Sequence, residues 1–226
     1  MLNTQIKTVL DASRTRGWVS EPDAKGLLAA SGLTVPRFTL VTDSGGIPSA
    51  AQSIGFPLAA KVLSSRILHK SDHGGVKTGI ATLEELVAVF ERFGRLNGFE
   101  GMLVEEMVSG LELIIGAKID DQFGPVVMLG MGGTGVEIYQ DISFRMAPVN
   151  SDDVSSMITS LKGGRLLSGY RGGVKVNRNE LTRTLVCFSE FVIAAAEMIE
   201  SIDLNPVMCS EERCVVADAR IMLPSQ

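Results

Sequence analysis

Clustered glycine is the feature that most constrains what this chain can fold into. Glycine makes up 24 of the 226 residues, about one in nine, against about 7% in an average protein. A residue without a side chain lets the backbone approach another group closely, so glycine clusters between apolar runs predict loops that close on a ligand or on a neighbouring segment. The clusters lie at 74–75, 130–135, 163–164 and 169–173.

The rest of the composition is that of a folded globular protein, with 45% hydrophobic and 21% charged residues. The net charge of −5 and the 5% aromatic content argue against a nucleic-acid partner. The longest mostly apolar run, 191–199, is far shorter than the ~20 residues of a membrane helix, so we expect no membrane span. The N-terminus has no signal-peptide pattern, and Cys187, Cys209 and Cys214 form no C-x-x-C motif. We therefore expect a reducing, cytoplasmic location.

The order of the apolar patterns predicts an α/β protein with two lobes. Up to residue 101, helical patterns at 4–16, 21–32, 47–54 and 83–97 alternate with strand patterns at 36–41, 58–63 and 76–80. Strand patterns then follow quickly at 102–104, 113–119, 125–129 and 136–149, before helices at 152–161 and 180–201 and a hairpin of 202–209 with 213–217. We expect a first lobe over residues 1–101 and a second over residues 102–226.

Two features of the first lobe carry positive charge. Lys61 lies in the apolar strand pattern 58–63, which suits either a lysine that reaches solvent at a sheet edge or one anchored to meet a phosphate. Both histidines of the chain lie in His69-Lys70-Ser71-Asp72-His73-Gly74-Gly75. This stretch fits three alternatives: an H-x-x-x-H metal site, a polar surface loop, or a phosphate loop in which Gly74 and Gly75 expose backbone N–H groups.

The stretch Gly130-Met131-Gly132-Gly133-Thr134-Gly135 matches the G-x-G-x-x-G pattern of dinucleotide sites. Such a site needs a helix directly afterwards. The β-branched and aromatic residues of 136–144 predict a strand instead, so the sequence favours a glycine-rich hairpin.

Two acidic stretches suggest ligand contacts, each with a structural alternative. Residues 104–108, followed by Glu112, fit a hinge whose backbone reads a purine and whose carboxylate holds a ribose, or else a solvated acidic turn. Asp203 and Asn205 share one face of a strand, and a hairpin partner can bring Asp218 beside them. These oxygen donors suit Mg²⁺, although Asn-Pro is also a common turn.

Taken together, these motifs resemble the ATP-grasp fold, and more narrowly the ATP-grasp (beta) subunit or domain of ADP-forming acyl-CoA synthetases of the acetate–CoA ligase type. The resemblance covers residues 21–221, and eight matching stretches in the family order make it specific. These are Ala60-Lys61-Val62, His69-Lys70-Ser71-Asp72-x-Gly74-Gly75-Val76, Val104-Glu105-Glu106-Met107, Phe123-Gly124-Pro125-Val126-Val127-Met128, Asp141-x-Ser143-Phe144-Arg145, Gly169-Tyr170-Arg171-Gly172, Asp203-Leu204-Asn205-Pro206 and Asp218-Ala219-Arg220.

The resemblance implies two α+β lobes that clasp ATP or ADP together with Mg²⁺. It also implies a histidine that accepts a phosphoryl group on the way to acyl phosphate and acyl-CoA. The implied contacts are Lys61, Gly74 and Gly75 to the phosphates; Glu105, Met107 and Val108 to adenine; Glu112 to ribose; Asn205 and Asp218 to Mg²⁺; His69 as the phosphorylated histidine, supported by Asp203; and Arg145 facing the transferring group.

The resemblance further implies a partner, because the CoA-binding part of such enzymes has no counterpart in this chain. We expect an alpha-type subunit in an α₂β₂ heterotetramer. Where the family commonly has Ser-Pro-Asp-Ile, this chain has Ser64-Ser65-Arg66-Ile67, just before the loop that carries His69. Two alternative functions are a non-catalytic regulatory ATP-grasp module and a carboxylate–amine ligase on the same fold.

Overall fold

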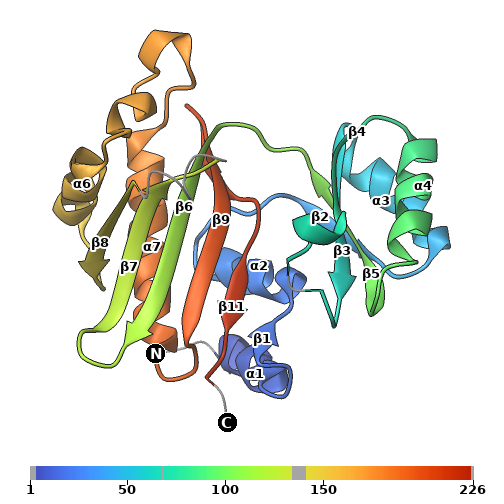
Figure 1. Cartoon of the computed structure of the whole chain (residues 1–226), viewed down its shortest axis with the longest axis horizontal. Helices are drawn as coiled ribbons and strands as arrows, with labels where there is room; N and C mark the ends of the chain where they lie inside the picture. The colour runs from blue at the N-terminus through green and yellow to red at the C-terminus, as the bar shows by residue number, and fades with distance from the viewer. Residues whose placement is uncertain (1–3, 68, 134–140, 225–226) are drawn as a thin grey trace. The chain divides into compact units, whose positions relative to one another are not determined.

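A computed structural model describes residues 4–67, 69–133 and 141–224 of the chain. The chain divides into two compact units, which are described separately (Figure 1). Unit 1 comprises Met1–Val35 with Ser109–Gln226, and unit 2 comprises Pro36–Val108. Among the described residues, no helix is long and apolar enough to cross a membrane.

These units divide the chain differently from the expected lobes, 1–101 and 102–226. Strand β1 (Trp18–Val19) pairs with β11 (Arg220–Met222), so the first 35 residues belong with the end of the chain. Position 101 falls inside β5 (Phe99–Glu106), which is hydrogen-bonded within unit 2. The difference arises because β1 pairs with a distant segment, which the order of local patterns does not reveal.

Unit 2 is a four-stranded antiparallel sheet in the order β2-β5-β3-β4, with two helices. Its strands are β2 (Phe38–Val41), β3 (Leu58–Ser64), β4 (Val76–Ile80) and β5, and its helices are α3 (Ile47–Ile54) and α4 (Leu83–Phe93). Alternate residues of β3, including Leu58, Ala60 and Val62, point into a core shared with α3 and α4. The opposite face of β3 carries Lys61.

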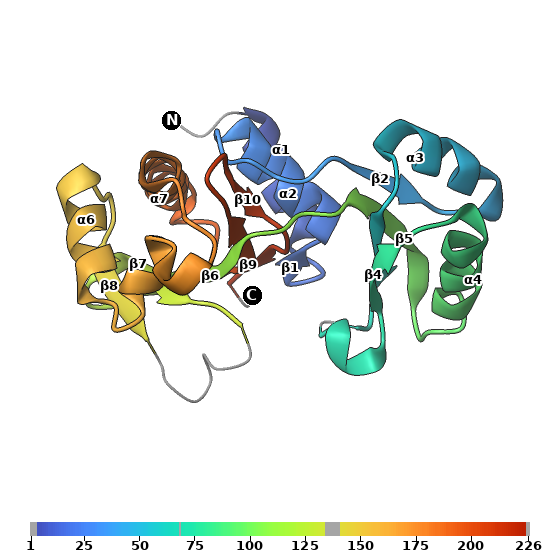
Figure 2. The ribbon, with the colours of Figure 1, turned by 90° about the horizontal axis from the view of Figure 1, so that it is seen from above.

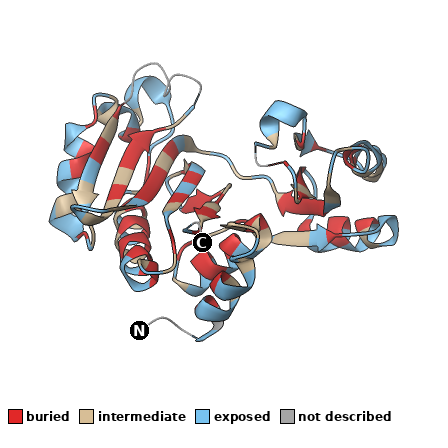
Figure 3. Ribbon diagram, turned by 60° about the horizontal axis from the view of Figure 1, so that its bottom comes forward, coloured by how far each residue is buried: buried red, intermediate tan, exposed pale blue. Residues whose placement is uncertain are grey.

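Unit 1 is built on an antiparallel sheet in the order β1-β11-β9-β6-β7-β8, with β10 on β9. Its further strands are β6 (Leu111–Asp120), β7 (Gly124–Met131), β8 (Ile142–Met146), β9 (Ser201–Cys209) and β10 (Cys214–Val216). Its helices are α1 (Thr4–Ser13), α2 (Glu21–Ala30), α6 (Ser151–Ser160) and α7 (Arg178–Ala195). Figure 2 shows α6 and α7 on one side of β7 and β8. Alternating burial along these strands and a buried stripe on α7 mark the core (Figure 3).

Local signals explain the start of several helices. Ser20, Thr82 and Asn150 precede α2, α4 and α6, and each side chain accepts a hydrogen bond from a first-turn N–H group. The predicted elements at 47–54 and 76–80 match α3 and β4. Helix α7 ends at Ala195 rather than near residue 201, although the apolar pattern continues to Ile199, which is buried. Residues 136–140 of the strand expected at 136–149 lie outside the described residues, and β8 forms part of the remainder.

The closing hairpin pairs Cys209 directly with Cys214 on β9 and β10. Both side chains are buried free thiols. A hydrogen bond with Cys214 and burial together raise the pKa of the Cys209 thiol above its ordinary value. The raised pKa keeps the Cys209 side chain a protonated thiol.

Helix α2 carries a buried ion pair that the sequence analysis did not predict. The Nζ of Lys25 lies 2.8 Å from Oε1 of Glu21, one helical turn away, and the two side chains are 0% and 4% exposed. Two charges removed from water are tolerated because they compensate each other.

Replacement of Lys25 by Met should lower the free energy of unfolding by about 3 kcal/mol, because Glu21 stays buried without the ammonium group. The matched control is Arg14→Gln, which breaks an exposed ion pair with Asp11 (2.9 Å) on α1 and should change the stability by less than about 1 kcal/mol. Urea unfolding of both variants tests this, and equal effects would contradict it.

Candidate functional site

In unit 2, Lys61 is held by Glu105. Its Nζ lies 3.3 Å from Oε2 of Glu105, and the two side chains are 10% and 3% exposed. Ala59 and Lys61 lie on the same face of β3, and Ala59 lies opposite Glu105 on β5. Lys61 is therefore a diagonal neighbour of Glu105 on that face. Of the two alternatives for Lys61, the structure supports an anchored lysine rather than one that reaches solvent at a sheet edge. The partner of Lys61 was not predicted, although Glu105 directly follows the apolar run 102–104 and was the available signal.

The loop from His69 to Gly75 returns the chain beside Lys61. Val76 pairs with Lys61 across β3 and β4, and the Val62 N–H donates to the carbonyl of Gly75 at 2.8 Å. His69 is exposed at the start of this loop. The loop thus tethers an accessible imidazole to the strand that carries Lys61.

The two glycines of this loop have structural tasks. Gly74 has φ = 65°, a left-handed conformation that favours glycine, and a Cβ on Gly75 would lie 2.5 Å from Val62 Cγ1. The N–H of Gly74 donates to the carbonyl of Ser71, and that of Gly75 to the carbonyl of Lys70 (2.7 Å). In this conformation both N–H groups are therefore used within the loop and are not presented to a phosphate.

The other residues expected at the adenine end follow directly on β5. Glu106 accepts a hydrogen bond from Nε of Arg37 at 3.0 Å. Met107 is exposed, and its Sδ accepts the N–H of Gly79 at 3.4 Å. Val108 is half-buried and ends unit 2. The chain beyond Glu106 is thus fixed beside β4.

In unit 1, the hairpin register brings Asn205 and Asp218 opposite each other. Val216 pairs with Val207 and Arg220 with Asp203. Counting along both segments between these pairs places Asp218 across from Asn205, and the Ala217 N–H donates to the carbonyl of Pro206 at 3.0 Å. The predicted approach of Asp218 to this strand is therefore correct.

Asp203 and Asn205 are exposed, whereas Leu204 between them and Ile202 before them are buried. The β6–β9 register shifts between Leu113 and Ile115, next to Asn205, as in the β-bulges that redirect a side chain. Oδ1 of Asp218 is a buried oxygen with no hydrogen-bond partner among the described residues, while the residue has other contacts. The face thus offers carboxylate and amide oxygens.

This donor set fits Mg²⁺ better than zinc. Among the described residues, no group of three or more His, Cys, Asp or Glu side chains could hold a metal ion. The H-x-x-x-H alternative for His69 and His73 therefore finds no support in that part of the chain. Mg²⁺ binds through one or two protein oxygens and keeps water and substrate oxygens as its other ligands, which matches Asn205 and Asp218.

Glu112 lies against the described part of the glycine-rich stretch. The Gly132 N–H donates to the carbonyl of Glu112 at 2.7 Å, and a Cβ on Gly132 would meet that carbonyl at the same distance. The carboxylate of Glu112 lies near Gly133, since a Cβ there would be 3.6 Å from Oε2. Glycine is thus required here for close packing on β6. Residues 134–140, and with them the rest of the expected hairpin, lie outside the described residues.

Arg145 lies on the opposite face of the sheet from Asp203. Cross-strand pairs place Asp203 (β9), Gly116 (β6), Met128 (β7) and Phe144 (β8) on one face of the sheet, because residues directly opposite each other share a face. The neighbour of Phe144, Arg145, therefore points to the helix-covered side, where its Nη2 donates to Oγ of Ser156 on α6 at 2.7 Å. The structure does not bring Arg145 together with the acidic residues.

The stretch Asp141-x-Ser143-Phe144-Arg145 holds α6 and the turn after it. The carboxylate of Asp141 accepts the N–H groups of Lys162 (2.7 Å) and Gly163 (2.6 Å), and Oγ of Ser143 accepts a hydrogen bond from Ser160. Three alternate residues of one motif thus fasten the same helix and turn. The contacts of this motif stabilise the fold, although its sequence contributed to the resemblance to an enzyme family.

A mixed α/β chain in two units, with a lysine in a sheet and oxygen donors on a second sheet, is what an ATP-grasp domain requires. The family model of the ATP-grasp domain matches residues 10–223. The beta subunit of acetate–CoA ligase [ADP-forming] I from Pyrococcus furiosus is 36% identical over 211 residues, covering 90% of both chains. The 4-hydroxybutyrate–CoA ligase [ADP-forming] of Nitrosopumilus maritimus is 37% identical, and this chain spans about 30% of its length.

Solved structures give the same result. The chain superposes on Candidatus Korarchaeum cryptofilum ACD1 in complex with coenzyme A with a TM-score of 0.90 and 35% identity, covering 97% of this chain and 100% of that one. The protein belongs to the ATP-grasp family, in the group of ADP-forming acetate–CoA ligase beta subunits. The predicted fold and family are thereby confirmed.

Replacement of Asp141 by Ala should lower the free energy of unfolding by about 3 kcal/mol, because two hydrogen bonds to a carboxylate are lost. Asp121→Ala, in the exposed turn between β6 and β7, is the matched control and should change it by less than about 0.5 kcal/mol. Denaturant titration of the two variants distinguishes them. A stable Asp141→Ala protein would contradict the structural role.

Proposed function

We propose that this chain is the nucleotide-binding subunit of an ADP-forming acyl-CoA synthetase and transfers a phosphoryl group between ATP and His69. The observation that carries the proposal is that the loop with the exposed His69 is hydrogen-bonded through Gly75 to the strand of Lys61, a lysine that can hold phosphate oxygens. Neutral imidazole is nucleophilic near pH 7. One ring nitrogen of His69 forms the bond to the γ-phosphorus as the bond to the ADP oxygen breaks, and the ring then loses its other N–H proton.

The residues divide this task as follows. Lys61, positioned by Glu105, holds phosphate oxygens, while the segment from Glu105 to Val108 binds adenine and Glu112 the ribose. Asp203 supports the phosphorylated histidine. Gly74 and Gly75 shape the loop of His69, and Arg145 is left out of the site because it faces α6.

Asn205 and Asp218 would hold Mg²⁺, which offsets the negative charge of the phosphates. The nucleotide and metal assignments are supported by relatives: the Korarchaeum synthetase has been solved with coenzyme A and Mg-AMPPCP, its phosphohistidine segment pointing towards the nucleotide binding site. Its chain is 33% identical to this one.

Complete synthesis of acyl-CoA requires a CoA-binding alpha-type partner, which we propose forms an α₂β₂ heterotetramer with this chain in the cytoplasm. The Pyrococcus relative is named a beta subunit, and the much longer Nitrosopumilus relative is a single chain. Both patterns are consistent with a second functional part supplied either by a subunit or by fusion.

Removal of the Lys61 charge should weaken nucleotide binding. We expect Lys61→Met to weaken the binding of AMPPCP with Mg²⁺ at least about tenfold, because a charge-assisted contact to phosphate is lost. Lys77→Met, on the adjacent edge strand β4, is the matched control and should bind normally. Isothermal titration calorimetry measures both, and equal affinity of the two variants would refute the assignment.

Phosphoryl transfer should depend on one of the two histidines. With γ-labelled ATP, Mg²⁺ and a CoA-binding partner subunit, we expect acid-labile, base-stable label on the wild type and on His73→Ala, and none on His69→Ala. Label that persists on His69→Ala would exclude the proposed acceptor. Normal nucleotide binding without label on any protein would favour a regulatory nucleotide-binding module.

A further inference from the structure

A cationic segment joins α6 to α7 in unit 1. Residues 162–178 contain Lys162, Arg165, Arg171, Lys175 and Arg178 but no Asp or Glu, in a chain with a net charge of −5. Positive side chains gathered on one surface raise the local concentration of anions. The proposed phosphoryl transfer assigns no task to this segment.

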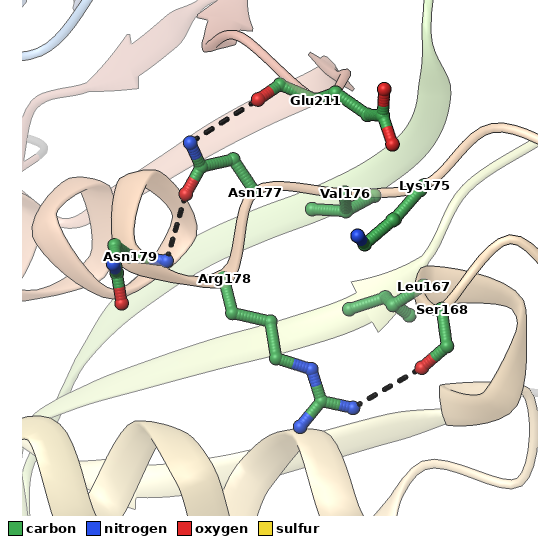
Figure 4. Close-up of a pocket in the computed structure, with 8 residues that line it drawn as sticks. All are labelled: Leu167, Ser168, Lys175, Val176, Asn177, Arg178, Asn179 and Glu211. Carbon is green, nitrogen blue, oxygen red and sulfur yellow. Dashed lines mark hydrogen bonds between the residues drawn. The ribbon is translucent and has the colours of Figure 1, made fainter.

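Two hollows lie along the segment, and together we call them the 162–178 basin. One has a volume of about 550 Å³ and is lined by residues that include Ser168, Lys175, Arg178 and Glu211 (Figure 4). The other, of about 290 Å³, includes Lys162 and Arg165. Ser168 and Arg178 line both, so the hollows adjoin. The first is within the size range of small-molecule sites.

The backbone of the basin is held at both ends. At its start, Asp141 accepts the N–H groups of Lys162 and Gly163. At its end, Ser168 and Lys175 form a β-bridge, and the Val176 N–H donates to the carbonyl of Leu167 at 2.9 Å. A fixed backbone reduces the conformational entropy lost when the lysine and arginine side chains close on a ligand.

Asn177 fixes the first turn of α7, which carries Arg178. Its side chain accepts hydrogen bonds from the N–H groups of Asn179 and Glu180 and donates one to the carbonyl of Glu211 at 3.2 Å. The bonds with Asn179 and Glu211 are drawn in Figure 4. The N–H groups at this helix start are therefore occupied. Attraction for an anion comes from the side chains of the basin, not from the helix terminus.

The charges of the basin are not neutralised within the described part of the chain. None of Lys162, Arg165, Lys175 and Arg178 forms an ion pair there, and Glu211 is the one carboxylate among the residues described as lining either hollow. Arg178 makes only a long contact, 3.5 Å, with Oγ of Ser168. Four cations against one carboxylate leave a clear excess of positive charge.

We propose that the 162–178 basin binds a small molecule with at least two phosphate groups, using residues different from those assigned to the nucleotide. The Arg178 guanidinium offers paired donors that match phosphate oxygens, and the Lys175 ammonium adds a point charge beside them. Lys162 and Arg165 receive a second phosphate in the adjoining hollow. Buried Leu167 and Val176 provide an apolar floor. This inference is independent of the proposed function.

Calorimetric titration of the full chain with inorganic pyrophosphate tests the proposal. AMPPCP and Mg²⁺ are kept saturating, so that the nucleotide site is already filled. We expect pyrophosphate to bind still, and Lys175→Gln and Arg178→Gln each to weaken it about tenfold. Lys7→Gln, an exposed lysine on α1 of the same unit, is the matched control and should bind as the wild type does. Thermal unfolding of all variants should be unchanged.

Three results would overturn the proposal. Pyrophosphate binding that disappears once AMPPCP is present would assign the anion to the nucleotide site. Equal affinities of Lys175→Gln and Lys7→Gln would exclude the basin. An absence of pyrophosphate binding, combined with weaker association of Arg178→Gln with a CoA-binding subunit, would make the basin a protein-docking surface instead.

Discussion

The ion pair between Lys61 and Glu105 is the constraint on which the organisation of unit 2 depends. Both charges lie on the two central strands of its sheet, on the face opposite the α3 and α4 core. A slip of one residue in β3 would turn Lys61 into that core and break the pair, so the buried charges enforce the register. The register in turn fixes where the loop of His69 leaves and returns, through Gly75 and Val76.

In unit 1, the residues proposed to bind ligands and the residues that hold the fold together lie on opposite faces of one sheet. The face of Glu112, Asp203 and Asn205 presents oxygen atoms that can serve a nucleotide and a cation. The other face carries Ser143 and Arg145, which fasten α6. Residues that are neighbours in a strand therefore have different tasks. A motif that identifies a family can consist largely of residues that hold its fold together.

The sequence predicted what local signals determine. Pro48 and Gly55 mark the start and the end of α3, and the alternation around Ile202 and Leu204 placed Asp203 and Asn205 on one face. Strands β1 and β11 were not predicted, because two- and three-residue strands have no periodicity and are defined by a distant partner. The face of Arg145 could not be predicted either, since it depends on the pairing of four strands. The partner of Lys61 and the occupied N–H groups of Gly74 and Gly75 likewise depend on tertiary contacts.

The central proposal is that Lys61 in unit 2 binds phosphate oxygens of the nucleotide and that Asn205 and Asp218 in unit 1 bind Mg²⁺. A crystal structure of the chain with AMPPCP and Mg²⁺ tests it most directly. We predict phosphate oxygens within hydrogen-bond distance of Nζ of Lys61, and Mg²⁺ at about 2.1 Å from oxygens of Asn205 and Asp218. A nucleotide bound away from Lys61, or a metal ion that contacts neither Asn205 nor Asp218, would contradict the account.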